Sequence, residues 1–295
     1  MMETLEQTLT AYSVWLDRQP LAEKTRVAYR FQVHQYGAYL AQRPPTVDDP
    51  LRTPFARDYA VRDYKTYLKT KRQAKPASVN LALAAIDHFH QFIGNERPRV
   101  QRESLPAQAP RALKPEEQKA LLRAIERTSS ARDKAIAQLL FYTAARLGEC
   151  AALNLDDVRI SARRGMVIIR SGKGDTYREV PLNVQVREAL RAWLKERTKQ
   201  FSHTSDPAFF LNHKGKRLSA RAIDLIIRRI GVDAHLELSA HVLRHTCLTN
   251  LVRAGNDLVL VAEIAGHKRL ETTRRYSLPS LEDRESAMEG LCLEY

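Results

Sequence analysis

Imidazoles, a guanidinium and a phenol fall within one short stretch near the carboxyl end of this chain. They are His241, Arg244, His267 and Tyr276. If Ser239 caps a helix, His241 and Arg244 lie one turn apart and face the same site. A planar guanidinium matches two anionic oxygens of a phosphate. These side chains suit covalent attack by a tyrosine on a phosphodiester.

Tyr276 would be the nucleophile. A phenol ionises near pH 10, so phenolate at neutral pH costs roughly 4 kcal/mol unless a neighbouring imidazole acts as base. Two alternatives compete with this interpretation. Most tyrosines only pack at a core edge, and His241 with His245 could be a metal pair at helical spacing. The Glu of a His-Glu-x-x-His motif is missing, so no metal site is predicted.

Two further cations stand earlier in the chain. Arg146 occurs in Thr143-Ala-Ala-Arg-Leu-Gly-Glu149, where the simplest alternative is an intrahelical ion pair with Glu149. Lys173 lies between two glycines and could equally be a solvated turn lysine. This Gly-Lys-Gly is not a phosphate-binding Walker loop, because the required Gly-x-x-x-x-Gly-Lys-Ser/Thr pattern is absent.

Composition favours a long polyanionic partner. The 295 residues carry a formal net charge of +14, and the pI is near 9.8, so nucleic acid is the leading partner and an anionic membrane the alternative. The chain has no run of about 18 apolar residues and an acidic amino terminus, which predicts a soluble cytoplasmic protein without membrane contact. Cys150, Cys247 and Cys292 have unrelated spacings, which predicts reduced structural thiols.

Periodicity predicts two domains. Residues 1–97 are expected to be all-helical, with helices over 24–41, 57–72 and 78–93. Val27, Phe31 and Leu40 form the apolar stripe of the first of these helices. Residues 98–112 are expected to form a basic, Pro-rich linker. Residues 113–295 are expected to be helical around a small sheet. The predicted helices span 115–127, 133–143, 184–197, 219–230, 241–254 and 258–265, and the predicted strands span 158–160, 166–170 and 177–180.

The joint order of these motifs resembles the tyrosine recombinase (phage integrase) family. The order is Arg in Thr-x-x-Arg-x-x-Glu, Lys in Gly-Lys-Gly before Arg-Glu-Val-Pro-Leu, His-x-x-Arg, Gly-His, then Tyr. The helices over 25–40 and from Ser78 also resemble that family's core-binding domain, so the resemblance covers nearly the whole chain. It implies a mainly α fold with a small β-sheet, in which a SAM-like helical domain precedes an α+β catalytic domain.

The resemblance also implies roles for individual residues. Tyr276 would be the nucleophile, Arg146 and Arg244 would clamp the scissile phosphate, and Lys173 would protonate the leaving 5′ oxygen. His241 would be the base, His267 would bind a phosphate oxygen, and Glu149 would brace the site. A 3′-phosphotyrosyl intermediate stores the bond energy, so no cofactor is expected.

The chain departs from the family pattern in three places. Ala144-Ala145 replaces the usual Gly-Leu or Gly-Met, Ala265 stands where Leu commonly precedes Gly-His, and Ser277-Leu278-Pro279 replaces the frequent Thr-His. The first two are small apolar exchanges. The third concerns the conformation of the tail and leaves the expected chemistry unchanged.

The implied partner is a double-stranded recombination site, bound as a homotetramer on two DNA duplexes. Lys71, Arg72, Lys75, Arg217 and Arg221 are expected to contact DNA phosphates. The amphipathic tail over 281–295 could dock on a neighbouring copy or fold on its own domain. With no extra arm-binding domain evident, a simple Xer/Cre-like recombinase or transposon resolvase is favoured. The alternatives are a type IB topoisomerase and a non-catalytic DNA-binding regulator.

Overall fold

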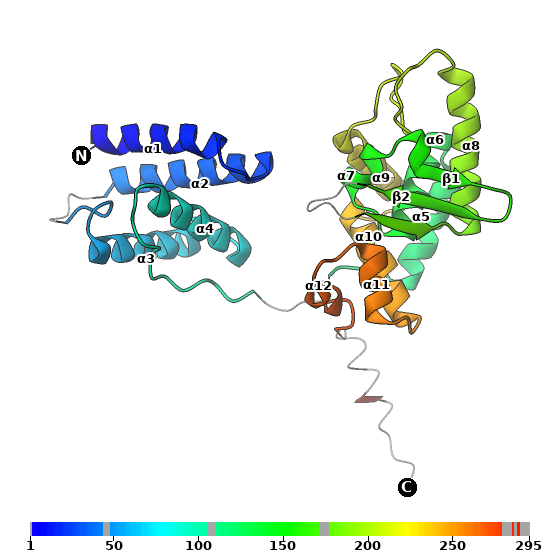
Figure 1. Cartoon of the computed structure of the whole chain (residues 1–295). Helices are drawn as coiled ribbons and strands as arrows, with labels where there is room; N and C mark the ends of the chain where they lie inside the picture. Colours follow the sequence, from blue (N-terminus) through cyan, green and yellow to red (C-terminus); the bar gives the residue numbers. More distant parts are fainter. Residues whose placement is uncertain are drawn as a thin grey trace, which may run out of the picture. The chain divides into compact units, whose positions relative to one another are not determined.

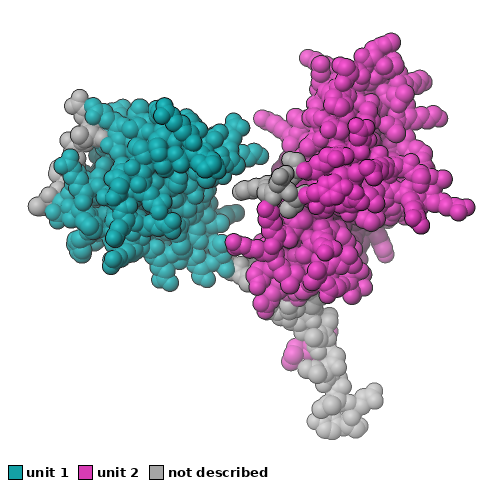
Figure 2. All heavy atoms as spheres, viewed as in Figure 1, with its two compact units in different colours: residues 1–106 teal, residues 107–295 magenta. Residues whose placement is uncertain are grey.

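The chain divides into two compact units, Met1–Pro106 and Ala107–Tyr295 (Figures 1 and 2). The computed structural model describes residues 2–43, 48–105, 110–170 and 177–278, with 285, 288 and 289. The fold is mainly helical with one three-stranded sheet, which confirms the expected fold class. The division between the two units falls after residue 106.

The first unit is all-helical in its described residues. Its helices are α1 (Met2–Asp17), α2 (Glu23–Ala41), α3 (Pro54–Thr70) and α4 (Pro76–Phe92). Proline opens α3 and α4, where its missing N–H would have no helical partner in any case. The three helices expected from periodicity are present, whereas α1 was not specifically predicted.

The expected apolar stripe of α2 was wrong at two of its three positions. Val27 and Phe31 are more than half exposed, whereas Leu40 packs against the core of this unit. Val33, Tyr36 and Gly37 are buried instead. The reason is the close approach of α1: a Cβ built on Gly37 would lie 2.5 Å from a methyl of Leu9. Contact with the unforeseen helix therefore selects which face of α2 is inside.

Part of the predicted linker belongs to the first unit. Glu103 forms ion pairs with Lys65 at 2.8 Å and with Lys69 at 3.0 Å, and Arg102 pairs with Asp87 at 2.7 Å. Asn80 also exchanges hydrogen bonds with the backbone of Glu103. Polar pairing of this kind leaves no hydrophobic periodicity, which explains why the sequence alone suggested a free segment.

The second unit surrounds a central buried helix. Its elements are α5 (Pro115–Arg127), α6 (Ala131–Thr143), α7 (Leu147–Ala152), the 3-10 turn η1 (Leu155–Asp157), β1 (Val158–Ile160), β2 (Gly165–Ile169), β3 (Arg178–Pro181), α8 (Val184–Gln200), α9 (Ala220–Asp233), α10 (Ala240–Arg253), α11 (Leu258–Ala265) and α12 (Leu270–Arg274). Helix α6 packs against α8 and α10. Nine of the thirteen residues of α6 are buried, on all sides of the helix, so its sequence shows little amphipathic periodicity.

The sheet is antiparallel in the order β1-β2-β3. Val167 is the central register position, paired with Val158 on β1 and with Val180 on β3. The predicted strands are confirmed within about one residue at each end. The predicted turn between β2 and β3, which contains Lys173, lies outside the described residues.

Side-chain caps fix where the site-bearing helices begin. Ser239 Oγ accepts from the backbone N–H of Val242 and starts α10, which confirms the expected cap. Asp257 caps α11 in the same way through the N–H groups of Val259 and Leu260. Because a cap satisfies donors that the helix leaves free, it sets the helix start and the phase of its side chains.

Two of the three cysteines are described. Cys150 and Cys247 are buried free thiols, as expected. Cys292 and most of the tail over 281–295 lie outside the described residues, as do the apolar positions Leu281, Leu291 and Leu293.

Candidate active site

Arg244 is buried at the centre of the site, with 5% of its surface exposed. Its Nη1 donates to the carbonyl oxygen of Ala144, and its Nη2 donates to that of Ala265 at 2.7 Å and contacts Nε2 of His267 at 3.0 Å. Burial, together with the nearby cation of Arg146, lowers the pKa of Arg244 to about 10. It therefore stays charged at neutral pH.

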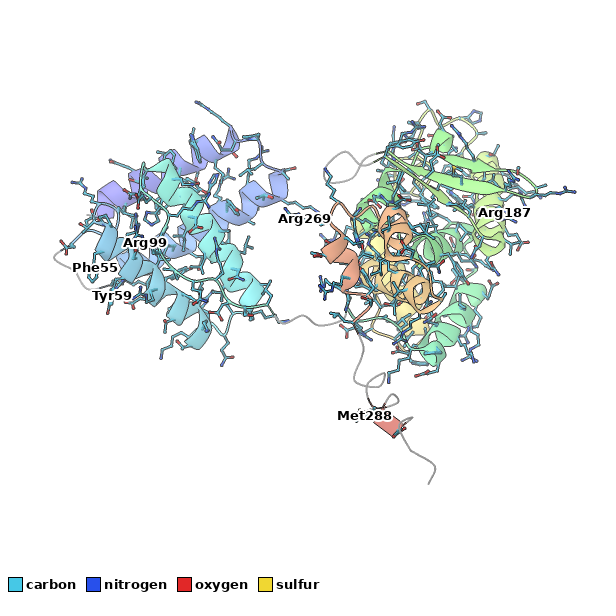
Figure 3. The ribbon with its side chains drawn as sticks, turned by 60° about the horizontal axis from the view of Figure 1, so that its bottom comes forward. Phe55, Tyr59, Arg99, Arg187, Arg269 and Met288 are labelled. Atoms are coloured by element: carbon cyan, nitrogen blue, oxygen red, sulfur yellow. The ribbon has the colours of Figure 1, made fainter. Side chains whose placement is uncertain are left out.

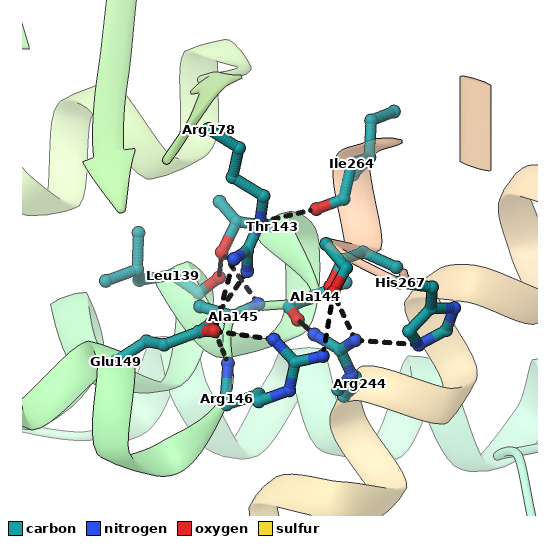
Figure 4. A network of polar contacts seen from close by, with 12 residues as sticks. Leu139, Thr143, Ala144, Ala145, Arg146, Glu149, Arg178, Arg244, Ile264 and His267 are labelled. Carbon is teal, nitrogen blue, oxygen red and sulfur yellow. Dashed lines mark hydrogen bonds and ion pairs between the residues drawn. The ribbon is translucent and has the colours of Figure 1, made fainter. Parts of the chain in front are cut away.

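Three arginines donate hydrogen bonds to consecutive carbonyl oxygens at the carboxyl end of α11 (Figure 4). The pairs are Arg178 Nε with Ile264 at 2.9 Å, Arg244 Nη2 with Ala265 at 2.7 Å, and Arg146 Nη2 with Gly266 at 3.1 Å. The last carbonyls of a helix lack helical partners and carry partial negative charge. Cations on them therefore stabilise this helix end and position His267, which follows directly.

Glu149 joins two of these arginines. Its carboxylate accepts from Arg178 at 2.6 and 3.1 Å, from Arg146 Nη1 at 2.7 Å and from the Arg146 backbone N–H at 2.8 Å. Burial by itself raises the pKa of Glu149, but the hydrogen bonds from Arg178 and Arg146 outweigh it and hold the pKa below its usual value. Arg146 is the residue before α7, so the pair is not the intrahelical one considered above.

Arg178 joins this cluster, although the sequence gives it no role beyond its place in Arg-Glu-Val-Pro-Leu. Strand alternation could have indicated this residue. The first and third positions of β3, Arg178 and Val180, are buried and lie on the inward face of the strand. An arginine on the inward face of a strand requires a buried partner, and Glu149 supplies it.

Replacing Arg178 by Leu should destabilise the second unit by about 3–5 kcal/mol, because it leaves the buried Glu149 carboxylate with half of its partners. Urea unfolding measures this cleanly in a Trp15→Phe background, where Trp193 fluorescence reports on the second unit alone. Arg123, exposed on α5, is the control, and Arg123→Leu should change stability by less than about 0.5 kcal/mol. Equal losses in both variants would contradict the role given to Arg178.

Tyr276 is buried just after α12, with 7% of its surface exposed. Its phenol oxygen lies 2.8 Å from Nδ1 of His245. Its ring lies parallel to that of His267, with centroids 6.1 Å apart and an interplanar angle of 10°. Burial raises the pKa of Tyr276, and the cations of Arg244, Arg275 and Arg146 oppose that rise.

The structure brings together Arg146, Glu149, Arg244, His267 and Tyr276 of the predicted set. His241 is exposed at the start of α10, and its side chain makes no hydrogen bond to any described residue. Of the imidazoles of His241 and His245, that of His245 is the one within hydrogen-bonding distance of the Tyr276 phenol. Lys173 lies outside the described residues.

Ala144 explains one departure from the family pattern. It ends α6 in the left-handed conformation, with φ of 52°, a region that glycine enters without steric strain. The buried Ala144 carbonyl accepts from Arg244, so the strained turn presents an oxygen to the site. The usual glycine at this position matches the backbone that the turn requires.

The predicted DNA-contacting residues fall into two groups. The side chains of Lys71, Arg72, Lys75 and Arg221 are exposed, and none forms a hydrogen bond or ion pair with another described residue. Arg217 differs, because its guanidinium donates to the backbone of Ala151 and Leu153 at 3.0 and 3.1 Å and to Asn154. Since these bonds hold Arg217 inside its own unit, the geometry argues against a phosphate contact by this residue.

The described ranges contain no cluster of three or more His, Cys, Asp or Glu placed to hold a metal ion. None of the helices they include has both the length and the apolar character to cross a lipid bilayer.

The helical fold with its small sheet and the cluster of Arg, His and Tyr are consistent with the class of DNA strand transferases. The phage integrase family model matches residues 111–281. The chain is 33% identical over 219 residues to the tyrosine recombinase XerA of Thermococcus kodakarensis, covering 72% of this chain and 74% of that protein. It is 30% identical over 277 residues to the tyrosine recombinase XerC of Roseiflexus sp. (strain RS-1), covering 88% and 85%.

Solved structures of Xer recombinases share the fold of this chain. A crystal structure of XerA recombinase matches with a TM-score of 0.55 and 26% identity, over 98% of this chain and all of that one. XerH site-specific recombinase, in a post-cleavage complex with a palindromic difH substrate, shares the fold with a TM-score of 0.75 and 22% identity, over 90% and 79%. The chain belongs to the phage integrase family and is a tyrosine recombinase, an enzyme of site-specific DNA recombination. The topoisomerase and regulator alternatives receive no support.

Proposed function

We propose that Tyr276 attacks a DNA phosphate, expels the 5′ hydroxyl and forms a 3′-phosphotyrosyl bond. The 5′ hydroxyl of a second strand then attacks this phosphotyrosyl bond, which rejoins the DNA and releases Tyr276. The observation that carries this proposal is the convergence of a phenol, an imidazole and a buried guanidinium from three separate segments: Tyr276, His267 and Arg244. Because the phosphotyrosyl bond conserves the energy of the phosphodiester, the reaction requires no ATP.

Arg146 and Arg244 stabilise the charge that gathers on the non-bridging phosphate oxygens. A guanidinium has five N–H donors. Arg146 gives two to Glu149 and Gly266, which leaves three, and Arg244 gives three to Ala144, Ala265 and His267, which leaves two. Each arginine therefore keeps donors for phosphate while internal bonds fix its orientation.

His267 must gain a proton before its Nε2 can donate a hydrogen bond to a phosphate oxygen. Its Nδ1 lies 2.8 Å from Thr273 Oγ1, and its Nε2 lies 3.0 Å from Arg244 Nη2, a donor. Burial and the nearby cations of Arg244 and Arg146 lower the pKa of His267 to about 4, so it is neutral in the free enzyme. An anionic phosphate favours the charged imidazolium, which then donates from Nε2 to a phosphate oxygen.

One role rests on motif position: Lys173, in Gly-Lys-Gly, protonates the leaving 5′ oxygen. His241, exposed one turn before Arg244 on the same helix, is free to donate a hydrogen bond to the phosphate. Duplex DNA is held through phosphate contacts by exposed cations such as Lys71, Arg72, Lys75 and Arg221. Four copies bound to two duplexes exchange strands in pairs, as integrase or resolvase of a mobile element or replicon.

The test begins with covalent capture. A random-sequence duplex library is incubated with the protein without metal or ATP, and molecules that stay attached after denaturation are sequenced to recover the cleavage site. Plasmids carrying two copies of that site are then treated with the protein. We expect deletion between direct repeats or inversion between inverted repeats. Relaxation of supercoils without any exchange would instead identify a topoisomerase, and DNA binding without capture would identify a regulator.

A further inference from the structure

Tyr276 has a hydrogen-bonding partner that the family motif did not indicate. Its phenol oxygen and Nδ1 of His245 are 2.8 Å apart, and the two ring centroids are 5.5 Å apart. His245 lies one residue beyond Arg244 on α10, whereas Tyr276 is 31 residues further along the chain. Packing of the chain after α12 against α10 therefore places a ring nitrogen of His245 within hydrogen-bonding distance of the phenol oxygen of Tyr276.

His241, the expected base, is placed differently. Its ring meets that of His245 edge-on, with centroids 5.9 Å apart and an interplanar angle of 79°. Among the described residues, no ring contact or hydrogen bond links His241 to Tyr276. His245 is thus the imidazole in reach of the phenol proton, and hydrogen-bond reach is the first requirement of a general base.

We propose that His245 is the general base of strand cleavage. As the Tyr276 oxygen bonds to phosphorus, its O–H bond breaks and the proton moves to Nδ1 of His245, whose ring carries its own proton on Nε2. The phosphorus–O5′ bond breaks, and the leaving oxygen takes a proton from Lys173. Rejoining runs the same transfers backwards, with His245 returning the proton to Tyr276. This inference rests on the proposed function and assigns its proton acceptor.

The electrostatics of the free enzyme are consistent with this role. Burial, the neighbouring His241 and the cations of Arg244 and Arg275 lower the pKa of His245 to about 4. His245 is therefore neutral at pH 7 and can accept a proton. Because the pKa of Tyr276 is raised, the transfer occurs only as attack proceeds. An arriving phosphate anion raises the basicity of His245, which couples proton transfer to substrate binding.

The test measures single-turnover formation of the covalent adduct on the duplex recovered by capture. We expect His245→Ala to lower the rate by about 10²–10⁴-fold, the usual contribution of general acid–base catalysis. Added imidazole should restore part of the lost rate by entering the vacated space and accepting the proton. His245→Asn retains an acceptor near Nδ1 but cannot take the proton, so it should stay slow. His213→Ala, an exposed histidine outside the site, should cleave like the wild type.

A second substrate separates the two proton transfers. When sulfur replaces the 5′ bridging oxygen, the leaving thiolate needs no proton because a thiol has a pKa near 8.5. Lys173→Ala should then form the adduct at close to the wild-type rate, whereas His245→Ala should form it slowly on both substrates. The inference is overturned if His245→Asn cleaves like the wild type, if His245→Ala cleaves at or above the wild-type rate, or if sulfur rescues it. Wild-type cleavage in the same assay keeps these outcomes distinct from failure of the proposed function.

Discussion

Tyr276→Phe should abolish covalent attachment to DNA while leaving DNA binding within a few-fold of the wild type. The substitution removes the only atom that would attack phosphorus, so no weaker version of the same reaction remains. The phenyl ring keeps its place beside His267, and only the bond to His245 is lost. Denaturing gel electrophoresis of the captured duplex, followed by peptide mapping of the wild-type adduct, measures this result.

The matched control is Tyr142→Phe. Tyr142 is a partly buried tyrosine of α6, and losing its hydroxyl is the same chemical change at a position away from the phenol of Tyr276. It should form the adduct at the wild-type rate. An adduct in Tyr276→Phe that maps to any other residue would refute the assignment of the nucleophile.

The second large effect is expected at Arg244. Alanine would leave the buried carbonyls of Ala144 and Ala265 without a donor, which mixes a folding defect with a catalytic one. Lysine keeps the charge but lacks the planar fork that reaches both carbonyls and a phosphate together. Arg244→Lys should therefore slow cleavage by about 10²–10³-fold, equivalent to about 2.7–4 kcal/mol of transition-state stabilisation.

Adduct formation and binding to the captured duplex are compared in the same preparations. Binding should change only a few-fold, because most affinity comes from phosphates outside the site. Arg269, an exposed cation that projects from the second unit (Figure 3), provides the contrasting variant. Arg269→Lys should cleave at the wild-type rate. Normal cleavage by Arg244→Lys would remove Arg244 from the phosphate clamp.

Helix positions were largely predictable because their signals are local. The cap at Ser239, the stop at Gly266 and the apolar spacing from Leu258 place α10 and α11 within about one residue of the prediction. Helix α1 and the inward face of α2 were not, because the contact between Leu9 and Gly37 joins two segments whose approach no local pattern encodes.

The sequence by itself determined the chemistry available to this protein: a basic, helical chain with Arg146, Arg244, His267 and Tyr276 in the family order. The tertiary structure alone decided how those groups are arranged. It placed His245 instead of His241 on the phenol, and it recruited Arg178 to Glu149 and to the end of α11. The physical reason is distance along the chain. Arg178 and its acceptor Ile264 are 86 residues apart, so only the packing of separate elements determines that they meet.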